Sequence, residues 1–377
     1  MSIFFISLMS GSPWGGSEEL WYASALRAAH KGHKVAIAVY HWPEKEMRMK
    51  ELADAGCEIH YLPNKGRKKK GIPDLVQNKI TKWFRIKKAI NALPVELYDL
   101  VVINQGYFEV TTNTWKSFNS RLKNYILLFH NYSENEKIKP DKALILHTWI
   151  RNASLNLFAS SRIRAILEDR LNISITNGDI LLNPVSFIPP EKPTPFPPLH
   201  NGNYRFVVLA ALDVDRKAQD QLIRALSASI WKERNWTLHL YGDGKDEKKL
   251  RRLIERAGLK EKVFLEGHVT GVEKILKEAH LLLQVSRIDA MPLSVVEALA
   301  LSRPVVASKI GDMPQWVLFN ENGWICHSAD ATEIERILHL VWANRSSWHK
   351  MGERSYEIFR KKYPPSPENY FLEQIGY

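Results

Sequence analysis

Cysteine and long apolar runs are both scarce in this sequence. Among 377 residues there are only two cysteines, Cys57 and Cys326, and they lie far apart. They predict neither a disulfide framework nor a cysteine metal site, and a reducing cytoplasm is the expected compartment. No stretch approaches the roughly 18 apolar residues that a membrane span needs. Residues 1–9 are apolar but few, with no basic leader, so we predict a first strand and not a signal peptide.

The signatures of several ligand-binding classes are also absent. The glycine-rich stretch Ser10–Glu18 follows the predicted first strand but does not read G-x-G-x-x-G, which disfavours a dinucleotide-dependent dehydrogenase. No helix-turn-helix or zinc finger can be recognised, so we expect no nucleic-acid partner. Hydrophobic residues make up 45% and charged residues 25% of the chain, as in ordinary globular proteins.

Positive charge is in excess and partly concentrated in one segment. The net charge is +12, and the segment Lys65–Lys88 begins with the run KGRKKK. One interpretation is a solvated loop and helix face. The other is contact with an anionic membrane surface, in which the interleaved Trp83 and Phe84 enter the interface. The second interpretation places the protein in the cytoplasm, peripherally on the inner face of the membrane.

Short apolar runs alternate with helical patterns along the chain. The first half opens with the strand-like Ile3–Leu8 and the helical Glu18–Lys31, and the second half with the strand-like Arg205–Leu209 and the helical Gln219–Ser229. This alternation predicts an α/β fold with doubly wound parallel sheets. Because 377 residues exceed what one core usually serves, we expect two domains.

A proline-rich stretch separates the two halves. Residues 184–198 hold seven of the 19 prolines, so no regular element is expected there. We predict a first domain at 1–185, a linker at 186–203 and a second domain at 204–362. Ligands of parallel sheets bind at the carboxyl ends of the strands, so we expect the two halves to form a cleft.

The stretch Ser286–Ser308, SRIDAMPLSVVEALALSRPVVAS, is the most informative. Pro292 is suited to open a helix, in whose early turns Glu297 stands eight residues after Asp289. Free amides at a helix start attract phosphate, and a nearby carboxylate can hold sugar hydroxyls. Two acids eight residues apart are common, however, and by themselves favour an ordinary loop and amphipathic helix.

The complete block resembles the acid-x7-acid motif and following Pro-Val-Val-Ala of glycosyltransferase family 4. That resemblance implies a GT-B fold, in which two Rossmann-like parallel-sheet domains face each other across a cleft. It also implies that Asp289 lies by the donor sugar and that Glu297 binds the nucleotide ribose. Asp289 replaces the usual Glu of the motif, and Ala290 replaces the usual Gly. By analogy with the family, residues 363–377 pack back on the first domain.

Two stretches of the first domain extend the resemblance. Gly15, Gly16 and Glu18 match a Gly-Gly-x-Glu loop that the family places over the cleft, although a tight turn without a ligand has the same composition. Trp14 is suited to stack on an acceptor sugar or to pack internally. His130 follows an apolar run, where the family has a histidine beside the reacting carbon of the donor. A lone histidine is otherwise more often structural.

The segment Leu209–Asp220 resembles Arg-Leu-Asp-…-Lys-Gly-x-Asp, in which Arg and Lys clamp the donor diphosphate. Lys217 matches the Lys, but Ala211 stands where the Arg is usual, and Arg216 is the candidate substitute. Losing one charge-assisted contact costs about 1.5–3 kcal/mol. Asp213 and Asp215 also form an Asp-x-Asp pair of the kind that holds Mg²⁺ or Mn²⁺. We predict a surface turn there and no essential metal.

The resemblance predicts a retaining hexosyltransferase that moves a sugar from a nucleotide diphosphate sugar to a hydroxyl of a glycan, a glycolipid or a small molecule. No cofactor is expected beyond that co-substrate. The predicted catalytic residues are His130 and Asp289, and the predicted donor-binding residues are Gly15, Gly16, Arg216, Lys217, Val269, Met291, Pro292, Leu293 and Glu297. Two alternatives remain open, a nucleotide-sugar 2-epimerase on the same fold and a non-catalytic nucleotide-sugar-binding protein.

Overall fold

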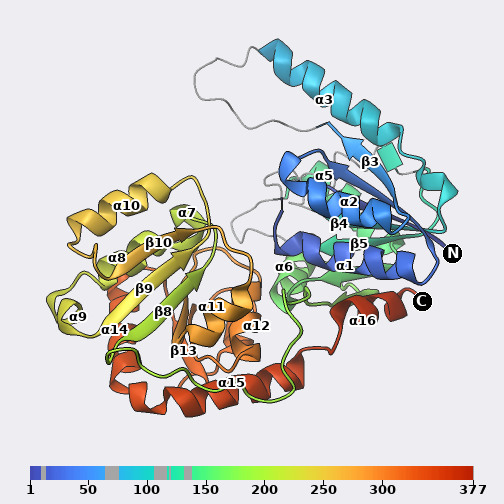
Figure 1. The fold of residues 1–377 in the computed structure, drawn as a ribbon. Helices are drawn as coiled ribbons and strands as arrows, with labels where there is room; N and C mark the ends of the chain where they lie inside the picture. The colour runs from blue at the N-terminus through green and yellow to red at the C-terminus, as the bar shows by residue number, and fades with distance from the viewer. Residues whose placement is uncertain (10–13, 64–75, 106–116, 119, 131–137, 377) are drawn as a thin grey trace. The chain divides into compact units, whose positions relative to one another are not determined.

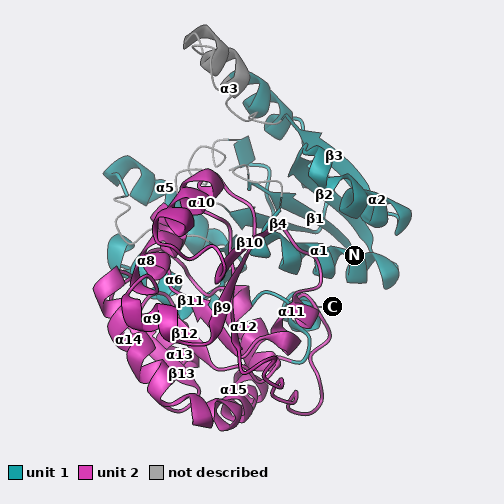
Figure 2. Cartoon of the chain, turned by 60° about the vertical axis from the view of Figure 1, so that its left-hand side comes forward, with its two compact units in different colours: residues 1–184, 365–377 teal, residues 185–364 magenta. Residues whose placement is uncertain are grey.

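The chain forms two compact units in a computed structural model that describes residues 1–9, 14–63, 76–105, 117–118, 120–130 and 138–376. Unit 1 comprises Met1–Pro184 and Pro365–Tyr377, and unit 2 comprises Val185–Pro364 (Figure 2). Part of the basic segment, residues 64–75, lies outside the described residues, as do residues 10–13 of the glycine-rich stretch. No helix in the described ranges is both long and apolar enough to span a membrane.

Unit 1 is built on a seven-stranded parallel sheet with the strand order β3-β2-β1-β4-β5-β6-β7. Figure 1 labels β3, β4 and β5 of this sheet. The strands are β1 (Ser2–Ser7), β2 (Lys34–Tyr40), β3 (Glu58–Leu62), β4 (Leu100–Gln105), β5 (Tyr125–Phe129), β6 (Leu155–Phe158) and β7 (Gly178–Ile180). The central strands are almost continuously apolar and buried, which is typical of a parallel sheet covered on both faces.

The helices of unit 1 are α1 (Gly16–His30), α2 (Glu46–Asp54), α3 (Val76–Asn91), α5 (Pro140–Asn152), α6 (Ser161–Leu171) and α16 (Pro367–Gln374), with short 3-10 turns η1 (Pro43–Lys45) and η2 (Val95–Leu97). Helix α16 comes from the far end of the chain. Its Phe371 and Leu372 are buried in the core of unit 1. Tyr370 also donates a hydrogen bond to the Asp179 carboxylate at 2.9 Å. The C-terminal residues are thus an integral part of unit 1.

Unit 2 is built on a six-stranded parallel sheet with the order β10-β9-β8-β11-β12-β13. Its strands are β8 (Tyr204–Leu209), β9 (Trp236–Tyr241), β10 (Val263–Gly267), β11 (Leu281–Gln284), β12 (Val305–Ser308) and β13 (Gly323–Cys326). Its helices are α7 (Val214–Lys217), α8 (Gln219–Ala225), α9 (Ser229–Glu233), α10 (Glu247–Arg256), α11 (Val272–Glu278), α12 (Leu293–Ala300), α13 (Met313–Trp316), α14 (Ala331–Ala343) and α15 (Trp348–Lys362), with the turn η3 (Arg345–Ser347).

The proline-rich stretch expected as a linker at 186–203 belongs to unit 2. Proline lacks an amide hydrogen, so the carbonyls of this stretch need donors from elsewhere. The Tyr356 hydroxyl donates to the carbonyl of Pro190 at 2.8 Å, and the Arg303 guanidinium donates to that of Pro195 at 2.9 Å. Arg303 is fully buried and also donates a hydrogen bond to the carbonyl of Leu276. Its burial lowers the pKa of the guanidinium to about 10.

Each sheet has a switch point beside its central strand. In unit 2 the chain runs outward from β8 to β9 and β10, then crosses to β11 on the other side of β8. In unit 1 it runs from β1 to β2 and β3, then crosses to β4. The loops that leave the carboxyl ends of strands diverge at such a point, and this is where open parallel sheets bind ligands.

Candidate functional site

Three loops at the carboxyl edge of the unit 2 sheet are tied together through their backbones. The amides of Arg287 and Ile288, after β11, donate to the carbonyl of Arg216 at 2.8 and 3.2 Å. The Asp312 amide, after β12, donates to the carbonyl of Ala290 at 2.9 Å. A Cβ atom at Gly311 would lie 1.8 Å from that carbonyl oxygen, so this close approach requires glycine. Backbone hydrogen bonds therefore hold the loops around the switch point together before a ligand binds.

The loop after β9 is locked to the same edge. The Gly242 amide donates to the carbonyl of Gly267 at 2.7 Å. A Cβ atom on Gly242 would lie 2.2 Å from the carbonyl oxygen of Ala210. This glycine therefore serves backbone packing. Val269, a predicted contact to the nucleotide base, follows β10 and is partly buried.

Lys217 and Asp289 meet at the switch point between β8 and β11. Their side chains form a direct ion pair, with exposed fractions of 14% and 13%. Lys217 ends helix α7, and Ala218 after it adopts a left-handed conformation with φ 48°. Asp289 lies in the loop that leads into α12. Two side chains 72 positions apart in the chain are thus brought together.

Arg216 precedes Lys217 on α7, and it forms no ion pair with an acidic side chain among the described residues. Its side chain is partly buried, and its Nε atom is buried without a hydrogen bond. Ala211, at the position where the motif usually has arginine, is exposed. A partly desolvated guanidinium with unsatisfied donors is a ready anion ligand.

Glu297 projects from α12 and is almost completely buried. Its Oε1 atom accepts hydrogen bonds from the amide and the hydroxyl of Ser186, at 3.0 and 2.6 Å. Ser186 lies in the proline-rich stretch, so this carboxylate also anchors that stretch to the site. Ser186 was not predicted, because two residues 111 positions apart give no local sequence signal.

The start of α12 rests on a buried chain of polar side chains. The Ser294 hydroxyl donates to Gln284 Oε1 at 3.2 Å, and the Ser286 amide donates to the Ser308 hydroxyl at 2.9 Å. Pro292 was expected as the first residue of the helix, but it is the N-cap, and the helix begins one residue later at Leu293. This difference is within the usual uncertainty of helix ends. Met291 and Leu293 flank it and are partly buried.

The glycine loop of unit 1 leads into a buried charge cluster. Gly15 caps α1, and Gly16 begins it. Glu18 is 0% and Lys45 1% exposed, and their charged atoms lie 3.0 Å apart. The same carboxylate accepts hydrogen bonds from Ser7 Oγ at 2.7 Å and Asn104 Nδ2 at 3.0 Å. Glu18 thus fixes the start of α1 to the ends of β1 and β4.

Trp14 is packed within unit 1. Its ring lies 5.5 Å from that of Tyr22, and the Arg48 guanidinium lies 4.2 Å above it. Its indole nitrogen donates to the Glu19 carboxylate at 2.6 Å. Of the two roles open to this residue, internal packing is the one that the structure describes.

His130 follows β5 at the carboxyl edge of the unit 1 sheet. It is buried, and neither ring nitrogen has a hydrogen-bond partner among the described residues. Burial lowers the pKa of this histidine to about 4, so the imidazole is neutral at pH 7. A buried imidazole with two unsatisfied nitrogens has both a donor and an acceptor available for a ligand.

The His130 pKa predicts a pH dependence of stability. Unfolded histidine titrates near 6.5 and folded His130 near 4, so the unfolded chain binds more protons between these values. Stability is therefore lost as the pH falls from 6.5 to 4, by about 3 kcal/mol in total. We expect His130→Gln to flatten this part of the curve in urea titrations of the full chain. Parallel curves for the variant and the natural protein would contradict the prediction.

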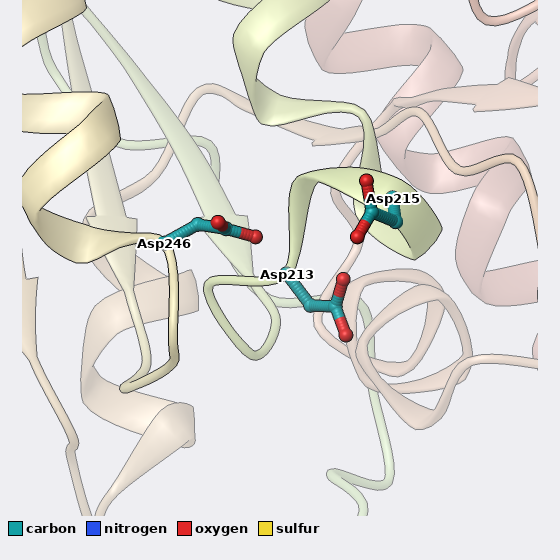
Figure 3. A group of neighbouring side chains, drawn as sticks. All are labelled: Asp213, Asp215 and Asp246. Atoms are coloured by element: carbon teal, nitrogen blue, oxygen red, sulfur yellow. The ribbon is translucent and has the colours of Figure 1, made fainter. Parts of the chain in front are cut away.

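Three carboxylates of unit 2 gather where the Asp-x-Asp pair was noted. Atoms of Asp213, Asp215 and Asp246 lie within 4.8 Å of one another (Figure 3). The Lys245 ammonium lies 3.2 Å from Asp213 and 2.8 Å from Asp215, and Asp246 accepts a hydrogen bond from the Val214 amide at 3.0 Å. Carboxylates of this kind could hold a divalent cation, and the single Lys245 ammonium is shared between two of them.

The predicted residues fall in both units. Gly15, Gly16 and His130 belong to unit 1, and the other predicted residues belong to unit 2. Within unit 2 the structure brings together the loops that carry Arg216, Lys217 and Asp289.

Comparisons with known proteins show what the chain is similar to in sequence and in fold. Residues 191–358 match the family model described as glycosyl transferases group 1. A poly(ribitol-phosphate) alpha-N-acetylglucosaminyltransferase of Staphylococcus aureus (strain COL) is 29% identical over 168 residues, which are 44% of this chain and 34% of that protein. The chain therefore matches only about a third of the length of that relative.

Solved structures are similar over the whole chain. Anabaena HepE in complex with UDP has a TM-score of 0.75 at 16% identity, over 100% of this chain and 99% of that one. HepE has also been solved with UDP-glucose. Sucrose-phosphate synthase from Thermosynechococcus elongatus has a TM-score of 0.75 at 14% identity, over 100% and 98%. The predicted GT-B fold is thereby confirmed. Residues 191–358 of this chain are thus similar in sequence to the group 1 glycosyl transferases, and the whole chain is similar in fold to these solved structures.

Proposed function

We propose that the protein is a retaining glycosyltransferase that moves a sugar from a nucleotide diphosphate sugar to a hydroxyl acceptor. The observation that carries this proposal is the meeting of Lys217, Asp289 and the start of α12 at the switch point of unit 2. The family match over residues 191–358 supports it, and so do the UDP and UDP-glucose complexes of HepE.

The diphosphate is assigned to the cationic side of this site. Lys217 and Arg216 are assigned to bind it with their positive charges, and the backbone amides at Leu293 add the positive end of α12. Negative charge grows on the diphosphate as the sugar leaves, and fixed cations stabilise that charge without a metal. The partly buried setting of both cations makes their interaction with phosphate stronger than it would be in water.

The sugar and the nucleoside are assigned to the remaining predicted residues. Asp289 and His130 hold the sugar hydroxyls, Glu297 holds the ribose, and the backbone near Val269 contacts the base. The bond between the anomeric carbon and the diphosphate oxygen breaks while the acceptor oxygen bonds to that carbon from the same side. The proton of the acceptor hydroxyl passes to the departing diphosphate, and the configuration of the sugar is retained.

A membrane-linked acceptor is part of the proposal. In the described part of α3, Phe84 is 59% exposed beside the basic residues Arg85, Lys87 and Lys88. Exposed aromatic and basic residues on one helix suit an anionic lipid surface, each basic residue contributing about 1 kcal/mol. A lipid-linked hydroxyl acceptor would be presented at such a surface.

The activity can be tested with a panel of nucleotide diphosphate sugars and hydroxyl acceptors, with and without EDTA. We expect one donor to be consumed only when an acceptor is present, with EDTA having no effect. Proton NMR of the product should show the anomeric configuration of the donor. Donor conversion without acceptor would identify an epimerase instead. Binding of a nucleotide without any turnover would identify a binding protein, and inhibition by EDTA would overturn the metal-independent mechanism.

Asp289→Asn should separate binding from transfer. The Lys217 ammonium forms an ion pair with the Asp289 carboxylate. Removing the negative charge of Asp289 should therefore let a nucleoside diphosphate bind several-fold more tightly to Lys217. Transfer should nevertheless fall about tenfold, because the sugar loses a charge-assisted hydrogen bond. Calorimetry and initial rates measure the two effects. Asp215→Asn, which changes an exposed carboxylate paired with Lys245, is the matched control. A parallel loss of binding and transfer would contradict the assignment.

A further inference from the structure

A hollow lies in unit 1, away from the residues assigned above. Its volume is about 560 Å³, within the range of about 300–1,000 Å³ usual for small-molecule sites. It is lined by the end of α5 and by residues 173–177, which precede β7. These elements lie at the amino ends of the strands, whereas His130 and Gly15 lie at the carboxyl edge of the same sheet. The hollow is therefore separate from the proposed transfer site.

Four polar side chains of this hollow can offer hydrogen-bond donors to a ligand, whereas the amide hydrogens of the fifth, Asn177, are bound to backbone carbonyls. His147 and Arg151 line it one helical turn apart on α5, on the same face of the helix. Neither has an acidic partner among the described residues, and none of the nine lining residues carries a carboxylate. Ser174 and Thr176 add two hydroxyls from the opposite wall. A positively charged, donor-rich hollow without an acid selects an anion.

Hydrogen bonds within unit 1 hold residues 173–177, which form one wall of the hollow, in place without a ligand. Asn177 Nδ2 donates to the carbonyls of Ala153 at 2.7 Å and of Ile150 at 3.1 Å, which joins this wall to the end of α5. The Ile175 amide donates to the Glu168 carboxylate at 2.9 Å. The carbonyls of Ile150 and Ala153 at the end of α5 are thus satisfied by Asn177. A pre-formed site binds without the cost of ordering its walls.

We propose that this hollow binds the phosphate group of a small phosphorylated compound. Arg151 supplies a forked set of donors that matches a phosphate, and His147 adds a further donor. The hydroxyls of Ser174 and Thr176 bind the remaining phosphate oxygens. The volume leaves room for an attached group of about the size of a sugar. This site does not depend on the activity proposed for the other residues.

Phosphorus NMR titration of the full chain with inorganic phosphate, glucose 1-phosphate and a short polyphosphate tests this site. A Lys217→Met background weakens phosphate binding at the proposed donor site, so that binding at the hollow can be followed separately. We expect saturable binding of glucose 1-phosphate, and Arg151→Ala should weaken it by at least about tenfold. Ser174→Asp should abolish it, because a carboxylate placed in the hollow repels the phosphate.

The matched control is Arg170→Ala. Arg170 is an exposed arginine in the last turn of α6, as Arg151 is in the last turn of α5. We expect this variant to bind glucose 1-phosphate as the background does. Equal losses in the two arginine variants, binding that Ser174→Asp leaves unchanged, or binding of polyphosphate alone would each overturn the proposal. All three positions are exposed, so the variants should fold, and circular dichroism checks that they do.

Discussion

Replacing Lys217 with methionine is expected to weaken the binding of a nucleoside diphosphate about a hundredfold. The variant loses a charge-assisted contact to phosphate, which contributes about 1.5–3 kcal/mol. It also leaves the Asp289 carboxylate without its ammonium partner, only 13% exposed and close to the phosphates that should bind there. The repulsion between these negative charges adds to the loss. Calorimetry with the nucleotide that the donor panel identifies measures the effect.

Lys245→Met provides the matched control for this prediction. Lys245 is a lysine of the same unit that is also paired with aspartates, but its side chain is 58% exposed. Solvent screens such a pair, so its loss should hardly change nucleotide binding. If both lysine variants bound the nucleotide equally well, Lys217 would have no place in the donor site.

The second large effect is expected from Lys45→Met, and it concerns stability. Lys45 is the buried partner of Glu18, and its removal leaves a fully buried carboxylate without a countercharge. Breaking a buried pair in this way costs about 3–5 kcal/mol. That is a large part of the total stability of an ordinary domain, about 5–15 kcal/mol. Hydrogen exchange of the β1 amides should therefore speed up strongly in the variant.

A double variant and a surface variant make this stability prediction specific. Glu18→Gln combined with Lys45→Met removes both charges, so it should recover part of the lost stability. Lys260→Met breaks an ion pair whose partners are 62% and 59% exposed, and it should leave unfolding almost unchanged. Unchanged exchange in the Lys45→Met variant would mean that this ion pair does not hold α1 in place.

The sequence predicted the fold class well because the apolar periodicity is strong. The strand predicted at Arg205–Leu209 appears as β8, which begins one residue earlier at Tyr204 and ends at Leu209. The expected linker shows the limit of this approach. Prolines correctly excluded a regular element, but composition does not reveal that Tyr356 and Arg303 bind the carbonyls of the stretch. Those contacts join residues more than a hundred positions apart.

Those residues of the candidate site that belong to short sequence motifs could be predicted. Asp289 and Lys217 were named from their motifs, and the structure pairs them. The partners that fix neighbouring groups were not named, since Ser186 and Lys45 belong to no motif. Glu18 matched a loop motif expected over a cleft, yet its side chain is buried inside unit 1. A sequence motif identifies which residue stands at a position, while burial depends on the packing around it.

The position of α16 has a consequence for biosynthesis. Phe371 and Leu372 complete the core of unit 1, but on the ribosome they are made only after all of Val185–Pro364. The apolar face of unit 1 that α16 covers is therefore exposed while unit 2 is translated. Unit 2 can already fold during that time. A fragment that stops at Pro184 would keep that face exposed permanently, and it should depend on chaperones or aggregate.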